Sequence, residues 1–216
     1  MSPLATFLAF AAAAMVLIVT PGMDTALVLR TSAVEGHRRG LATVAGICTG
    51  CLVWGTSVAL GLGALLVASH TAYTLVKWAG AAYLAWLGVN LLLKPRERFA
   101  PAVGGAPAQK ARFGAFGRGL GTNLLNPKCG VFYVSFLPMF VPHGWPVGPT
   151  LFGLCLAHVI MGFVWLGFVA MATAPLGQLL ARPGVAKWLD RATGSVFLAF
   201  AKALDTAIWR ARSNRL

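Results

Sequence analysis

Two short polar motifs lie inside long apolar stretches of the sequence: Thr20-Pro21-Gly22-Met23-Asp24 and Asn123-Leu124-Leu125-Asn126-Pro127-Lys128. Each motif combines a proline with one charged side chain. Proline lacks an N–H donor and interrupts a helix, which leaves backbone polar groups that lipid cannot satisfy. A charge inside a membrane is costly, so it normally faces a protein-lined cavity on a substrate or ion pathway. Two interrupted helices, one with an acidic and one with a basic side chain at its break, and one in each half of the chain, are typical of a transporter binding site.

The composition indicates an integral membrane protein. The chain has 216 residues, of which 58% are hydrophobic and only 11% are charged, and its mean hydropathy is +0.75. Soluble domains carry about 25% charged residues. The net charge of +13 comes mostly from loops between apolar runs, as the positive-inside rule expects, and not from a basic face interleaved with aromatic residues. We therefore expect the chain to contact a lipid bilayer and no nucleic acid.

Six apolar spans must position the two motifs, since one span needs about 20 residues. They are predicted at about 4–29, 41–68, 75–93, 114–140, 150–175 and 190–209, with the breaks in the first and fourth spans. The loops after spans one, three and five, together with the adjoining starts of spans four and six, hold twelve lysine and arginine residues, whereas the N-terminus and the other two loops hold none. This asymmetry places the odd-numbered loops in the cytoplasm and both termini outside. The basic tail at 210–215 then lies on the disfavoured side, so five spans with one re-entrant segment are the alternative.

The two halves of the chain resemble each other. The pattern Lys-Trp, Gly and Tyr-Leu-Ala-Trp at 77–86 recurs loosely as Lys-Trp, Gly and Phe-Leu-Ala-Phe at 187–200. Three spans per half is an odd number, so the second copy must be inserted in the opposite orientation, with the binding site between the copies. We predict an all-α integral membrane protein whose six transmembrane helices form a 3+3 inverted repeat with broken first and fourth helices. The halves cover about 1–95 and 113–216, and a polar linker at 96–112 joins them.

Small residues in the second span allow two interpretations. Cys48-Thr49-Gly50-Cys51 has the spacing of a redox pair or of half a metal site, but no second such pair accompanies it. Packing between helices is therefore favoured for these cysteines. The glycines at positions 46, 50, 55, 61 and 63 form a small-residue face that permits close helix contact, either within one monomer or across a homodimer.

The motifs, in this order, resemble the lysine-exporter (LysE/RhtB) family of bacterial amino-acid exporters over nearly the whole chain. The family's Thr-Pro-Gly-Pro-Asp/Asn element stands here as Thr20 to Asp24, with Met23 in place of the second proline. Its Asn-Leu-Leu-Asn-Pro-Lys element is intact at Asn123 to Lys128. The other matching segments are 35–41, 77–88, 136–138 and 188–194. The resemblance implies a single LysE-type translocator domain over 1–216, which crosses the bacterial plasma (inner) membrane several times.

The resemblance also implies export of an amino acid by proton antiport, with a substrate site at the two breaks and no cofactor. Asp24 can pair with the substrate ammonium or carry the coupled proton, and Lys128 can pair with the substrate carboxylate or with Asp24. The two asparagines can bind substrate, or they can satisfy the carbonyls freed by Pro127. Asp24 and Lys128 can equally form a purely structural pair. The predicted substrate-binding residues are Pro21, Gly22, Asp24, Asn123, Asn126, Pro127 and Lys128.

The remaining polar residues of the spans bear on the coupling ion and on competing functions. His158 is either a second proton-coupling candidate beside Asp24 or a hydrogen-bonded packing residue. One acidic and one basic group at the breaks favour a neutral or zwitterionic substrate, such as homoserine, threonine or leucine. The alternative is a transporter of a metal or other inorganic ion, although the spans contain no His/Asp/Glu cluster of ligand spacing. An enzyme would need a nucleophile–base set or a metal-ligand motif, and the sequence offers neither.

Overall fold

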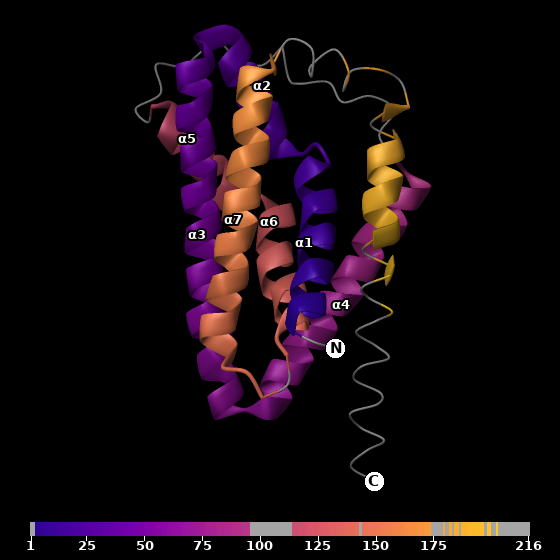
Figure 1. Cartoon of the computed structure of the whole chain (residues 1–216). Coiled ribbons are helices and arrows are strands. Elements are labelled where there is room, and N and C mark those ends of the chain that lie inside the picture. The colour runs from indigo at the N-terminus through magenta and orange to yellow at the C-terminus, as the bar shows by residue number, and fades with distance from the viewer. Residues whose placement is uncertain are drawn as a thin grey trace.

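The structure is a computed structural model that describes residues 3–95, 114–142 and 144–173, together with 179, 182, 184, 185, 187–196, 198, 199 and 202. These residues form helices and no β-strand, which confirms the all-α class (Figure 1). The predicted linker at 96–112 and the predicted end of the sixth span lie outside the described residues. A helical stretch at 187–196 includes the predicted start of the sixth span at 190. The remaining elements are α1 (Pro3–Val19), α2 (Met23–Glu35), α3 (His37–Ala68), α4 (His70–Leu93), α5 (Ala115–Leu124), α6 (Pro127–Val131), η1 (Phe132–Phe136), η2 (Leu137–Phe140) and α7 (Val147–Met171).

The first predicted span is a bent pair of helices. α1 ends at Val19, α2 begins at Met23, and the two helices are bent by 52° relative to each other. Pro21 accounts for the interruption, because it has no N–H to donate to the carbonyl of Leu17, four residues earlier. Gly22 is extended and precedes α2 without a side-chain cap. The sequence motif around Pro21 thus marks a bend between two helices.

The fourth predicted span is interrupted at the second motif and is irregular beyond it. α5 ends at Leu124, and the side chain of Asn126 caps α6 by accepting a hydrogen bond from the N–H of Lys128 (3.1 Å). Pro127 lies in the first turn of α6, where a missing donor is tolerated. The chain continues as the π-turn η1 and the 3₁₀-turn η2. The sequence motifs did not reveal this second irregularity, which extends to Phe140 and contains Pro138, a residue that cannot donate a helical hydrogen bond.

Two described helices are long and apolar enough to cross a membrane by themselves. They cover His37–Leu62 in α3 and Val147–Met171 in α7, and the bent pair α1–α2 adds a third candidate if it counts as one span. Six spans arranged as a 3+3 inverted repeat therefore stay a prediction. α3 and α7 lie side by side through the molecule, and α3 also packs against α2 and α5 (Figure 1).

Glycines bring α3 and α5 into backbone contact. A Cβ atom on Gly46 would lie 2.0 Å from the carbonyl oxygen of Phe116, and one on Gly119 would lie 2.2 Å from the carbonyl oxygen of Thr43. Only residues without a Cβ atom fit such an approach. The small-residue face predicted for the second span is therefore used, at Gly46, for packing within the monomer.

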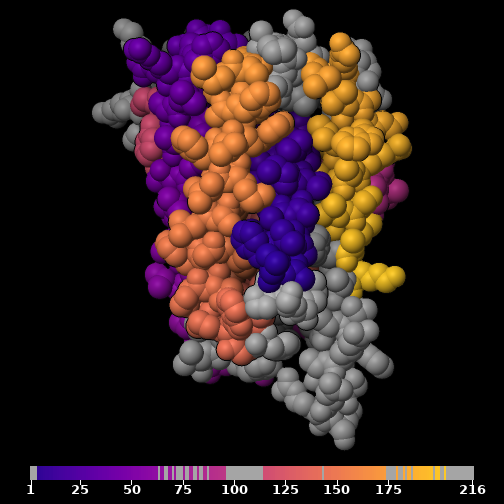
Figure 2. All heavy atoms as spheres, in the orientation of Figure 1, coloured from indigo at the N-terminus to yellow at the C-terminus, as the bar shows by residue number. Residues whose placement is uncertain are grey.

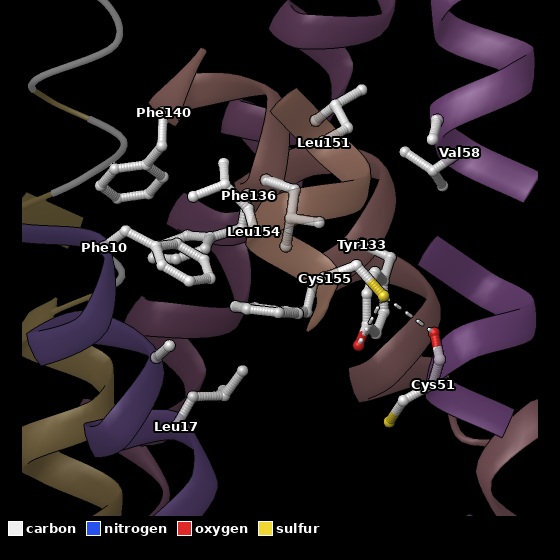
Figure 3. Close-up of a cluster of buried hydrophobic side chains, with 14 of the residues drawn as sticks. Phe10, Leu17, Cys51, Val58, Tyr133, Phe136, Phe140, Leu151, Leu154 and Cys155 are labelled. Carbon is white, nitrogen blue, oxygen red and sulfur yellow. Dashed lines mark hydrogen bonds between the residues drawn. The ribbon is translucent and has the colours of Figure 1, made fainter. Parts of the chain in front are cut away.

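A cluster of buried aromatic side chains fixes α1 against the irregular end of the second break (Figure 3). The rings of Phe10 in α1 and Phe140 in η2 meet edge to face at 5.4 Å, and Phe136 stacks 4.9 Å from Phe132. Edge-to-face and stacked ring pairs are favourable beyond the area that they bury. In Figure 2, α1 lies at the surface between α7 and the described residues near the C-terminus. The packing of α1 thus joins the first break to the second.

Two polar contacts join elements at the end of the molecule opposite the α3–α4 turn (Figure 1). Glu35, at the end of α2, forms a salt bridge of 2.5 Å with Arg118 in α5. His37, at the start of α3, lies with its Nδ1 2.8 Å from the carbonyl oxygen of Ala170 near the end of α7. These contacts place the start of α3 and the end of α7 on the same side of the molecule.

Candidate functional site

Asp24 connects the two helix breaks. It lies in the first turn of α2, where the partial positive charge of a helix N-terminus favours a carboxylate. Its Oδ2 accepts a hydrogen bond from Nδ2 of Asn123 (2.9 Å) and lies 3.5 Å from Sγ of Cys129. Asn123 belongs to the last turn of α5, and Cys129 belongs to α6. The carboxylate of the first break is thus held by residues on both sides of the second break.

Asn123 is a fully buried side chain whose position depends on a glycine in α3. A Cβ atom on Gly50 would lie 2.6 Å from Oδ1 of Asn123, so only glycine leaves room for the amide. Besides Asp24, the Nδ2 group lies 3.4 Å from Sγ of Cys51 and 3.2 Å from Sγ of Cys129. The amide is therefore oriented by groups on α2, α3 and α6, which fixes the direction of its oxygen.

Two acceptor oxygens at this point have no donor among the described residues. They are Oδ1 of Asp24 and Oδ1 of Asn123, both buried. Buried polar atoms are normally hydrogen-bonded, and an unsatisfied one costs about 1–3 kcal/mol. The two oxygens are oriented differently, since Oδ1 of Asn123 lies against Gly50 of α3, whereas Asp24 lines a cavity between the breaks and its carboxylate can accept from an ammonium group. The site therefore has the chemistry to bind a protonated amine.

Lys128 replaces the hydrogen-bond donor that Pro21 lacks. Its Nζ donates to the carbonyl oxygens of Leu17 (2.9 Å) and Thr20 (3.0 Å), at the C-terminal end of α1. In a continuous helix, the carbonyl of Leu17 would accept from the N–H of residue 21. The negative end of the α1 dipole also favours a cation at this place. Lys128 thus joins the second break to backbone carbonyls at the first break.

A cavity of about 70 Å³ lies where the two breaks meet α3 and α7. Five of the residues predicted from the sequence line it: Gly22, Asp24, Asn126, Lys128 and His158. Asn123 contacts Asp24 without itself lining the cavity, and Pro21 precedes Gly22 in the break. Pro127 instead lines a separate, more open pocket of about 460 Å³ beside Trp54. The structure therefore collects most of the predicted site residues around a single cavity.

His158 is a buried residue of α7 that is held by aromatic groups of η1. Its Nδ1 lies 2.8 Å from the hydroxyl of Tyr133, and its ring centroid lies 4.5 Å from that of Phe132. Sγ of Cys155 contacts the same hydroxyl and the carbonyl oxygen of Cys51 (Figure 3). Both interpretations of His158 are compatible with this geometry, since the ring is hydrogen-bonded and also lines the cavity.

Three residues of this region were missed by the sequence reasoning. Cys129 directly follows the Asn-Pro-Lys motif, and Cys51 ends the Cys-Thr-Gly-Cys segment. Their positions beside these motifs were the available signal, but helix packing was the favoured interpretation of the cysteines. Tyr133 had only the weak signal of a hydroxyl within an apolar run. All four cysteines are free thiols, and the described residues include no group of three or more His, Cys, Asp or Glu side chains that could hold a metal ion.

Comparisons with known proteins agree with the motifs. The chain is 31% identical over 202 residues to an uncharacterized membrane protein of Vibrio cholerae, covering 93% of this chain and 97% of the relative. It is 31% identical over 198 residues to the threonine efflux protein of Escherichia coli (strain K12), covering 90% and 94% of the two chains. It is 30% identical over 191 residues to the homoserine/homoserine lactone efflux protein of Salmonella typhimurium, covering 88% and 91%. No solved structure matches.

The profile of one protein family extends over most of the sequence. The LysE type translocator family matches residues 15–207, which include both breaks and every residue of the cavity. This match confirms the resemblance that the motifs indicated. The chain belongs to the LysE type translocator family.

Proposed function

We propose that this protein exports a neutral, zwitterionic amino acid through the membrane. The observation that carries the proposal is the carboxylate of Asp24, whose buried Oδ1 has no donor among the described residues and which lines, together with Lys128, a cavity between two broken helices. Broken helices with free backbone groups are a recurrent way of binding polar substrates within a membrane. The names of the relatives, which refer to threonine and homoserine efflux, support an amino acid as the substrate.

The substrate ammonium binds the carboxylate of Asp24, which Asn123 orients, and the substrate carboxylate faces Lys128 and the N-terminus of α2. A Cβ atom on Gly22 would lie 3.7 Å from Nζ of Lys128, so this ammonium and the start of α2 are neighbours. α2 has no side-chain cap, which leaves its first N–H groups available to an anion. The two charges of a zwitterion are thereby compensated within a single site.

Coupling to protons follows from the same carboxylate. When the substrate ammonium leaves Asp24, the buried charge must be compensated, and a proton can take its place. Exchange of amino acid for proton at one carboxylate gives antiport, with export driven by the inward proton gradient. His158, which lines the same cavity, is the second proton-coupling candidate.

The proposed architecture is one translocator domain over 1–216 with six spans as a 3+3 inverted repeat in the bacterial plasma (inner) membrane. It is supported by the two breaks, at Pro21 and Asn126–Pro127, which lie at similar positions in the two halves. Their meeting at one cavity is the arrangement expected of inverted repeats. Transport needs neither a cofactor nor a catalytic group in this scheme.

The test is transport by the purified full-length chain in proteoliposomes. We would load vesicles with an unlabelled amino acid and follow counterflow of labelled threonine, homoserine, leucine and lysine, together with decay of an imposed pH gradient. The variants are Asp24→Asn and Lys128→Ala. Matched controls are Glu97→Gln and Lys94→Ala, which remove the same charges from the polar linker and from the exposed end of α4.

We expect saturable threonine-type flux that dissipates the pH gradient, with loss of at least tenfold in Asp24→Asn and unchanged flux in both controls. Flux that survives Asp24→Asn and Lys128→Ala would make these residues structural and would contradict the proposed site. Movement of a metal or other inorganic ion, without any amino-acid flux, would replace the exporter by the alternative function.

A further inference from the structure

The cavity between the breaks has a polar end and an apolar wall. The charged groups, Asp24 and Lys128, lie at the breaks. The apolar wall combines Ile47 of α3, Val159 and Leu166 of α7 and Phe132 of η1. Apart from Asp24 and Lys128, the described lining residues include no carboxylate, ammonium or guanidinium group. A substrate whose backbone charges bind at the breaks would thus direct its side chain toward an uncharged surface.

Gly162 lies in the middle of the wall that α7 contributes. The lining residues of α7 are His158, Val159, Gly162 and Leu166, which share one face because they are spaced by one and two helical turns. Gly162 is therefore one turn from the polar His158 and one turn from the apolar Leu166. It is the place on this face where the wall has no side chain.

Packing does not require a glycine at position 162. A Cβ atom there would meet no atom within 4 Å. By contrast, a Cβ atom on Gly55 would lie 2.1 Å from Sγ of Cys155, and one on Gly50 would clash with Asn123. Glycine also weakens a helix relative to alanine. The absence of a side chain at Gly162 costs helix stability and leaves open space beside a ligand cavity, which gives this glycine a role in ligand binding.

We propose that Gly162 determines the size of the side chain that the site accepts, and that the substrates are amino acids with small, uncharged side chains lying against this residue. The inference rests on the proposed function. A larger residue at position 162 would fill the space next to the cavity without moving the helices. It would therefore exclude the larger substrates first and leave the binding of the ammonium and carboxylate unchanged.

The experiment measures counterflow of labelled serine and labelled leucine by the full-length protein in proteoliposomes. The variants are Gly162→Ala and Gly162→Val, and the control is Gly153→Val. Gly153 lies on the same helix, also meets no atom within 4 Å, but does not line the cavity. One methylene in an apolar pocket changes selectivity by about 10- to 200-fold. We therefore expect Gly162→Val to lower the leucine-to-serine ratio at least tenfold, Gly162→Ala to lower it less, and Gly153→Val to leave it unchanged.

The outcomes separate the inference from the function on which it rests. An unchanged ratio in a Gly162 variant with intact serine flux overturns the role of Gly162 and leaves the exporter in place. Absence of amino-acid flux in the unmodified protein overturns the proposed function and the inference together. If Gly162→Val does not yield a monodisperse protein, the ratio measured for Gly162→Ala decides, because one methyl group fits the open space.

Discussion

At the residue scale, Lys128 and Pro21 compensate each other. Proline removes one donor from α1, and an ammonium from the other half of the chain supplies it to Leu17 and Thr20. The half-buried Lys128 differs from an ordinary ion-pair partner, because its hydrogen bonds go to backbone carbonyls beside the break. The stability that Lys128 contributes should consequently depend on whether residue 21 is a proline.

Lys128→Ala should destabilise the protein by about 1–3 kcal/mol, because it leaves buried carbonyl oxygens without a donor. In the presence of Pro21→Ala the same change should cost less, since alanine restores an N–H for the carbonyl of Leu17. Thermal unfolding in detergent of the single and double variants measures this coupling, and Lys94→Ala is the control. Strict additivity of the two changes would contradict the compensation.

Asn123→Ala should weaken substrate binding about tenfold or more, because it removes the donor that orients the buried carboxylate of Asp24. The concentration for half-maximal counterflow measures the effect. Asn90→Ala is the matched control, because the amide of Asn90 donates to the carbonyl of Trp86 in its own helix. Equal affinities in both variants would remove Asn123 from the site.

The sequence alone predicted the polar residues at the breaks because prolines and charges are conspicuous in apolar spans. Asp24, Asn126 and Lys128 needed no tertiary information to be singled out. The contacts of Asn123 with Cys51 and of His158 with Tyr133 could not be predicted, since they depend on which face of each helix meets its neighbour. For the same reason, Gly162 looked like any other glycine until the structure placed it on the cavity wall.

At the element scale, the glycines of α3 fall into two kinds. Gly46 supports a backbone contact with α5, whereas Gly61 has nothing within 4 Å. The sequence pattern places both glycines on one small-residue face. It does not indicate how far along α3 the partner helix extends, so it cannot distinguish a packed glycine from an unpacked one. The length and apolar character of α3 and α7 could be predicted from the sequence. The π-turn and 3₁₀-turn after α6 could not be predicted, because their hydrogen-bond pattern depends on tertiary packing.

Gly46→Ala should destabilise the protein by about 1–3 kcal/mol, because the new methyl group meets the backbone of α5 at Phe116. Gly61→Ala should instead stabilise it by about 0.5–1 kcal/mol, as alanine does in an unhindered helix. The difference between the two unfolding transitions in detergent measures the close approach. A stabilised Gly46→Ala variant would show that α3 and α5 do not meet at this distance.

At the scale of the whole molecule, the loops that the sequence assigns to opposite membrane faces lie at opposite ends of the structure. The turn between α3 and α4 at Ser69 is at one end, and the start of α3 at His37 meets the end of α7 at the other (Figure 1). Twelve basic residues occupy the loops assigned to the cytoplasm and the adjoining starts of spans four and six. The charge asymmetry therefore predicts that the α3–α4 turn lies outside the cell and that the start of α3 lies in the cytoplasm.

Ser69→Cys should react with a membrane-impermeant maleimide added to intact cells, whereas Arg38→Cys should react only after the membrane is opened. Both residues lie at helix ends, and Arg38 is exposed. The unmodified chain, with its four free cysteines, provides the background labelling. The reverse pattern would invert the orientation, and labelling of both positions from outside would contradict a membrane-spanning α3.

The π-turn η1 bears on how the length of the chain can vary. A π-turn holds about one residue more than an α-turn, with Leu137 donating to the carbonyl five residues back, at Phe132. A single-codon deletion at the half-buried Val134 would convert it into an α-turn while Tyr133 keeps facing His158 and Phe140 keeps facing Phe10. The same deletion in the middle of α3 would rotate everything beyond it by about 100°. Insertions and deletions of one residue among related chains should therefore concentrate at this turn.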